Sequence, residues 1–145
     1  MTEAQASSTP KHLWIVGILA LLWNLMGAYD YLMTETKNEA YMSKFTPEQL
    51  EFFYGFPAWL VVFWAIAVWG SVAGSVLLLM RRKSAVPVFI ASFVSMIVTL
   101  IHNYGFAGAA DITGATGTIF SVIIFVVALG LILYSRNLAG KGVLS

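Results

Sequence analysis

Residues 57–80 of the sequence read PAWLVVFWAIAVWGSVAGSVLLLM, a stretch without one charged side chain. An α-helix needs about 20 predominantly apolar residues to cross the hydrocarbon core of a bilayer, and this stretch is longer. Three more apolar stretches, at 13–33, 85–106 and 115–135, approach or exceed that length, and Asp30 is their only charged residue. The sequence therefore predicts an all-α membrane protein, a bundle of four transmembrane helices.

The overall composition supports the same class. Hydrophobic residues make up 59% of the 145 residues and charged residues 10%, whereas soluble domains carry about 25% charged residues. The net charge of +1 argues against nucleic acid as a partner. Because the chain has no cysteine, disulfides and thiolate metal sites are excluded. We expect neither a metal nor another cofactor, and the lipid bilayer is the expected partner.

The first apolar stretch is predicted to be a retained helix rather than a signal peptide. A single lysine precedes it, its apolar run is too long, and no small-x-small cleavage site follows. The predicted organisation is a flexible tail over residues 1–10, a transmembrane domain over 11–136 and a second tail over 137–145.

Basic residues are unevenly distributed between the two sides of the predicted bundle. Six of the eight lysines and arginines fall in the two tails and in the turn after the second span, and the other two lie in the 34–56 loop beside four glutamates. Lysine and arginine accumulate in cytoplasmic loops, so we expect both termini on the cytoplasmic side of a bacterial inner membrane. The six are Lys11, Arg81, Arg82, Lys83, Arg136 and Lys141.

The 34–56 loop carries a helix-start signal of its own. In Thr46-Pro47-Glu48-Gln49, the threonine is a typical N-cap, proline suits the first helical position, and the glutamine completes a capping box. The apolar residues that follow predict a short interfacial helix. It serves either as an anchor that caps the bundle or as a lid over a site.

Small residues mark two predicted packing surfaces. Helices in lipid associate where small side chains let their backbones approach closely. The second span offers Ala67, Gly70 and Gly74, and the fourth offers Gly117 and Ser121. These residues are predicted to pack helices together, either within one chain or between copies in a homo-oligomer.

Polar residues follow one side of the first span and one side of the third. At about 100° per residue, the polar side chains fall within an arc of about 120° in the first span and about 100° in the third. Lipid offers polar groups no partner, so both stripes should face the bundle interior or a water-filled cavity. The candidate cavity residues are Asn24, Asp30, Tyr31, Ser95, Thr99, His102 and Asn103.

Asp30 and His102 both fall in the outer part of their spans. Their side chains are therefore at a similar depth, where they can contact each other. Three interpretations follow. The polar groups satisfy one another and fix helix register, or they bind a polar solute or relay a proton, or they hold a metal. The last is the weakest, because only these two side chains would serve as ligands.

Three segments resemble a group of small bacterial inner-membrane proteins. They are 22–31 (LWNLMGAYDY), the loop 41–57 with its FTPEQ, and 64–71 (WAIAVWGS), and the likeness extends from about residue 11 to residue 136. Members of this group are named hypothetical proteins or sugar transporters. The resemblance implies transport of a solute of the sugar class, but it implies no particular binding residues.

Two functions are compatible with these features. The first is a non-enzymatic membrane protein that binds, senses or transports a small polar solute through an outward-facing polar cavity. The alternative is an accessory or scaffold subunit of a larger membrane complex. An enzyme is not expected, because the sequence has no P-loop, zinc-protease motif or nucleophile elbow, and a lone Asp–His pair lacks a nucleophile.

Overall fold

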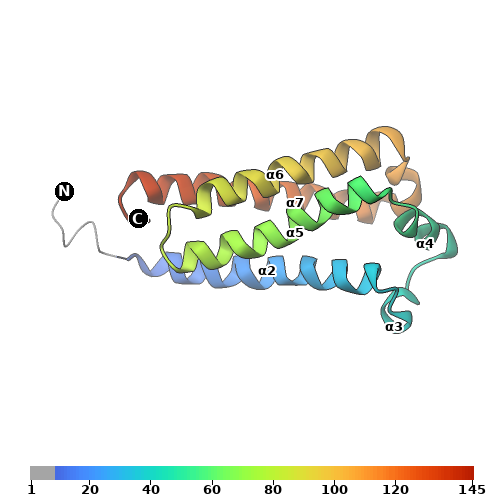
Figure 1. Ribbon diagram of the computed structural model, residues 1–145, viewed down its shortest axis with the longest axis horizontal. Helices are drawn as coiled ribbons and strands as arrows, with labels where there is room; N and C mark the ends of the chain where they lie inside the picture. The colour runs from blue at the N-terminus through green and yellow to red at the C-terminus, as the bar shows by residue number, and fades with distance from the viewer. Residues whose placement is uncertain (1–8) are drawn as a thin grey trace.

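The computed structural model describes residues 9–145, which form helices and connecting turns without a β-strand (Figure 1). The long helices are α2 (Lys11–Glu35), α5 (Ala58–Leu79), α6 (Ala85–Leu100) with its continuation η1 (Ile101–Phe106), and α7 (Ala109–Gly140). The short helices α3 (Glu39–Met42) and α4 (Pro47–Tyr54) lie between α2 and α5. The prediction of an all-α four-helix bundle with a short helix in its first long loop is confirmed. Residues 1–8 of the predicted flexible tail lie outside the described residues.

Among the described residues, four helical segments are long and apolar enough to cross a membrane. They are α2, α5, α6 with η1, and α7, so the chain has the fold of a multi-pass membrane protein. The start of α2, the 80–84 turn and the C-terminal residues lie together at one end of the bundle, called here the terminal end (Figure 1). Helices α3 and α4, η1 and the start of α7 lie at the opposite end, called here the loop end (Figure 1).

The local signals of the sequence explain where the helices begin. The Thr46 hydroxyl accepts a hydrogen bond from the Gln49 backbone N–H at 3.2 Å, and the Gln49 side-chain oxygen accepts one from the Thr46 N–H at 3.1 Å. This is the predicted capping box, and it starts α4 at Pro47. Pro57 is instead the residue immediately before α5, with extended backbone angles, and no side chain caps that helix.

Helix α7 is longer than the predicted span, and it is interrupted. It begins at Ala109, but Gly114 has φ 72° and ψ −168°, which are not helical angles. The uninterrupted part therefore starts at residue 115, as predicted. At the other end α7 continues to Gly140, five residues beyond the predicted end of the span.

The predicted C-terminal tail is packed against the protein. The Ser145 N–H donates to the Arg81 carbonyl at 2.9 Å, and the Ser145 carbonyl accepts from the Lys83 N–H at 3.0 Å. Leu144 is fully buried. The chain end is thus held beside the turn between α5 and α6.

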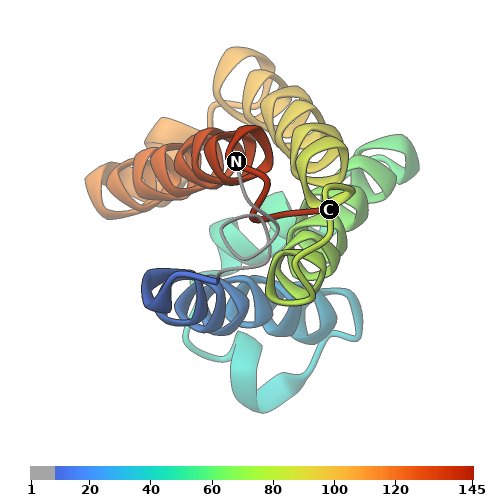
Figure 2. The ribbon, with the colours of Figure 1, turned by 90° about the vertical axis from the view of Figure 1, so that its left-hand side faces the viewer.

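Helix α5 is central to the packing, with α2 on one side and α6 on the other. A Cβ built on Gly70 would lie 3.1 Å from the Cβ of Ser92, and one on Gly74 would lie 2.6 Å from the ring of Phe89. The two glycines therefore let α5 and α6 approach closely within one chain. Helix α7 packs mainly against α6 and makes few contacts with α2, as the separation of the two helices in Figure 2 also shows.

The apolar core fills the terminal end of the bundle. Its fully enclosed side chains include Leu13 of α2, Leu78 of α5 and Leu138 of α7, and α6 adds Phe89. Among residues 9–145 this core does not extend to the loop end, where the helices surround a cavity instead.

Candidate functional site

The loop-end half of the bundle encloses a cavity of about 880 Å³, lined by all four long helices. The apolar core closes it toward the terminal end. Phe45, Phe52, Phe53 and Phe56 line it at the loop end, where α4 crosses the bundle axis behind the long helices (Figure 2). These four aromatic rings, called here the aromatic roof, contact one another at centroid distances of 5.1–6.4 Å.

A chain of hydrogen bonds connects α2, α5 and α6 in the part of the cavity nearer the terminal end. The Asn24 side-chain NH₂ donates to the Ser75 hydroxyl at 2.9 Å and to the Ser71 carbonyl at 3.2 Å. The Ser71 and Ser92 hydroxyls lie 2.6 Å apart. This set, called here the polar ladder, satisfies the serine hydroxyls and fixes the register of three helices.

In the part of the cavity nearer the loop end, Asp30 accepts a hydrogen bond from the Tyr41 hydroxyl. Tyr41 belongs to α3, which is capped by the Asn38 side chain at 3.0 Å from the Tyr41 N–H. Burial and this hydrogen bond to Asp30 raise the pKa of the Tyr41 hydroxyl well above its usual range. The Lys44 ammonium lies 3.8 Å from the centroid of the same ring, where the ring face attracts it.

His102 lies apart from Asp30. Its Nδ1 lies 3.1 Å from the Asn103 side-chain oxygen, and its ring packs edge-on against Trp59 and Phe56 at 5.5 and 6.5 Å. Within residues 9–145 no hydrogen bond or ion pair joins it to Asp30. No group of three acidic or histidine side chains in this part of the chain is placed to hold a metal.

A change of helix type occurs in the segment that holds His102. From Ile101 the chain is a π-helix, in which the Ala107 N–H donates to the His102 carbonyl five residues back. His102 follows Ser95 by seven residues, and residues seven apart lie on nearly the same side of an α-helix. The side of the helix that lines the cavity is the one with Thr99 and Asn103, and His102 is not among the lining residues.

The other predicted cavity residues divide into two groups. Asn24, Asp30, Thr99 and Asn103 line the cavity, whereas Tyr31 and Ser95, like His102, do not. Tyr31 packs on Trp64 at 4.8 Å, and Ser95 is buried in α6.

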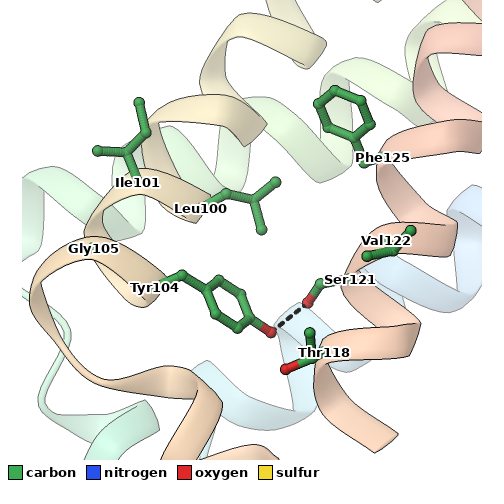
Figure 3. Close-up of a pocket in the computed structure, with 8 residues that line it drawn as sticks. All are labelled: Leu100, Ile101, Tyr104, Gly105, Thr118, Ser121, Val122 and Phe125. Carbon is green, nitrogen blue, oxygen red and sulfur yellow. Dashed lines mark hydrogen bonds between the residues drawn. The ribbon is translucent and has the colours of Figure 1, made fainter. Parts of the chain in front are cut away.

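The predicted packing residues of α7 are Gly117 and Ser121. Both line the cavity and also contact η1. The Tyr104 hydroxyl of η1 spans the space to α7, 2.8 Å from the Ser121 hydroxyl and 3.4 Å from the Gly117 carbonyl (Figure 3). Ala67 lines the cavity as well, beside the α5–α6 contact.

Sequence reasoning missed Tyr41, Tyr104 and the aromatic roof. Tyr41 lies in the four-residue helix α3, which is too short to show a periodicity. Tyr104 follows Leu100 by four residues, and both line the cavity. The run of aromatic residues after the capping box is the one signal that could have indicated the roof.

No known protein family, curated protein or solved structure matches this chain. The resemblance to small inner-membrane proteins stays a prediction, and the function is argued from the cavity.

Proposed function

We propose that this chain is a non-enzymatic integral membrane protein that binds a small organic molecule in the cavity between its helices. The observation that supports it is the cavity itself, about 880 Å³ in volume and closed toward the terminal end. Ligand sites are typically about 300–1,000 Å³, mainly apolar and aromatic, with a few placed polar groups. The aromatic roof, Asp30 and Asn103 match that description.

We do not propose catalysis, because Asp30 and His102 do not pair with each other. Asp30 accepts from Tyr41, and His102 packs outside the cavity against Trp59. Without a nucleophile beside either group, the site offers binding rather than chemistry.

The proposed orientation has the terminal end in the cytoplasm of a bacterial cell and the loop end outside the inner membrane. Its support is the gathering of Arg81, Arg82, Lys83, Arg136 and Lys141 beside the chain's ends, following the positive-inside preference. The cavity then lies in the outer half of the bilayer, under α4. Binding there is the first step of either sensing or transport.

Co-purification tests the proposal. The full chain is purified in a mild detergent, and bound small molecules are counted by native mass spectrometry. Gly27→Leu places a side chain in the cavity, where a Cβ would lie 3.9 Å from Val68. Gly130→Leu is the matched control, because nothing lies within 4 Å of a Cβ there and Gly130 is exposed.

We expect a bound molecule in the wild type and in Gly130→Leu, and its loss from Gly27→Leu. Ala128→Leu, a second substitution in the cavity wall, should act in the same way. A wild-type protein without a bound molecule, or equal occupancy in all variants, would overturn the proposal.

The second candidate function is an accessory or scaffold subunit, or a homo-oligomer. The observation that favours it is the loose packing of α7 against α2, which leaves room for a helix of another subunit. Cross-linking in native membranes followed by blue native electrophoresis tests it. A single species of monomer mass would exclude both assemblies.

A further inference from the structure

The cavity opens sideways, through the lipid-facing surface of the helices. Met26, Phe120 and Ile124 line it, yet they are 62%, 51% and 36% exposed. These residues flank the space between α2 and α7. The cavity thus has an opening on one side of α7.

A surface groove lies on the other side of α7, beside the cavity. It has a volume of about 580 Å³ and runs between the end of α6, η1 and α7 (Figure 3). Leu100, Tyr104 and Ser121 line both this groove and the cavity. Two hydrogen bonds of the Tyr104 hydroxyl lie between the two spaces, at 2.8 Å to the Ser121 hydroxyl and at 3.4 Å to the Gly117 carbonyl.

The opening between α2 and α7 reaches the middle of a span. Ile124 is ten residues from Gly114, where the uninterrupted part of α7 starts, which is about 15 Å along an α-helix. The hydrocarbon core is about 30 Å thick. In the proposed orientation this opening therefore faces acyl chains, whereas the aromatic roof and the apolar core cover the two ends that face water.

The cavity wall also limits what can bind. Three hydroxyls of the wall already have partners. Those of Ser71 and Ser92 pair with each other, and the Thr99 hydroxyl donates to the Met96 carbonyl at 2.7 Å. A sugar would need several unpaired donors and acceptors here. An alkyl chain needs none.

Polar groups with remaining hydrogen-bonding capacity lie toward the loop end. They include the Asn103 amide nitrogen, the second carboxylate oxygen of Asp30, and the Lys44 ammonium, whose partners are aromatic rings. An amphiphile would place its polar head group among them and its alkyl chain in the apolar part of the cavity nearer the terminal end.

We propose that the occupant is a single-chain amphiphile that enters from the bilayer beside α7, with its alkyl chain in the cavity and its head near Asp30, Lys44 and Asn103. This inference rests on the proposed function and adds the class of ligand and its route.

The test uses a palmitoyl lysophosphatidylcholine probe with a photoactivatable diazirine and an alkyne tag in its acyl chain, because its zwitterionic head group suits a site with both Asp30 and Lys44. It is mixed into phosphatidylcholine nanodiscs that hold the full chain, and adducts are located by tandem mass spectrometry after irradiation. Met96 lines the cavity and is 8% exposed, whereas Leu19 is 61% exposed on the outer surface of α2. The ratio of adducts at Met96 to adducts at Leu19 separates bound probe from surrounding lipid.

We expect adducts at Met96 in the wild type and in Gly130→Leu. Their ratio to Leu19 should fall about tenfold in Gly27→Leu, because an overfilled cavity loses at least the 1.4 kcal/mol that corresponds to tenfold weaker binding. Ala128→Leu provides the same measurement if Gly27→Leu lacks the helical circular dichroism of the wild type.

The other outcomes overturn the inference in distinguishable ways. If Met96 is unlabelled while native mass spectrometry still finds a molecule that Gly27→Leu loses, the cavity binds something other than an alkyl amphiphile and the proposed function stands. If Met96 is labelled equally in all variants, the probe reaches it without occupying the cavity. If neither a bound molecule nor labelling is found, both proposals fall.

Discussion

A methyl group added at Gly74 tests how closely α5 and α6 pack. Its Cβ would lie 2.6 Å from two carbons of the Phe89 ring, well inside van der Waals contact. Phe89 is 3% exposed, so the ring has no free space into which it can turn. Either the helices separate or the ring leaves its rotamer, and overpacking of this kind costs about 1–3 kcal/mol.

The same substitution has a second effect that must be subtracted. Alanine is a better helix former than glycine, by about 1 kcal/mol in peptides. Gly130→Ala gains this propensity alone, because nothing lies within 4 Å of a Cβ at that position. The free energy of unfolding of Gly74→Ala should therefore lie about 1–3 kcal/mol below that of Gly130→Ala.

The assay is unfolding in mixed micelles of increasing SDS fraction, followed by circular dichroism. Adding Phe89→Leu to Gly74→Ala should recover part of the loss, because the shorter side chain relieves the contact; the two changes are then non-additive. Equal transition midpoints for Gly74→Ala and Gly130→Ala would refute the close α5–α6 packing described above.

Three further predictions concern hydrogen bonds. Asn24→Leu removes both bonds from α2 to α5 and should lower the free energy of unfolding by about 1 kcal/mol in the same titration; an unchanged midpoint would contradict the polar ladder. The raised pKa of Tyr41 means that its stabilising contribution is complete below the usual tyrosine pKa of about 10 and is lost as pH rises above it. Wild type should therefore lose stability above that pH relative to Tyr41→Phe, and parallel pH profiles would count against the bond to Asp30. Thr46→Ala removes the cap of α4 at a cost of about 1 kcal/mol, which hydrogen exchange should report as faster exchange in α4 but not in α5.

Much of the fold could be predicted because its signals are local. Each span is long and apolar by itself, and the capping box at Thr46 needs only the four residues that form it. Gly70 and Gly74 fall on one side of α5 because α5 is a regular α-helix throughout its length.

The candidate site could be predicted only in part, because a polar stripe is wider than the part of it that meets the cavity. Thr99 and Asn103 line the cavity, whereas Ser95 and His102, seven residues apart on one edge of the same stripe, do not. Gly114, whose backbone angles are not helical, separates the first turn of α7 from the rest. The partner of Asp30 is Tyr41 of the short helix α3, and no spacing rule connects that helix to α2.

The polar ladder has a consequence for how the protein moves. It joins α2, α5 and α6, and no member of it lies on α7. Segments with fewer contacts open at a lower free energy than the whole protein unfolds, so we expect the loop-end part of α7 to separate before the other three helices come apart, while Leu138 stays in the apolar core. The residence time of anything held beside α7 is then set by that local opening and not by the overall stability of the bundle.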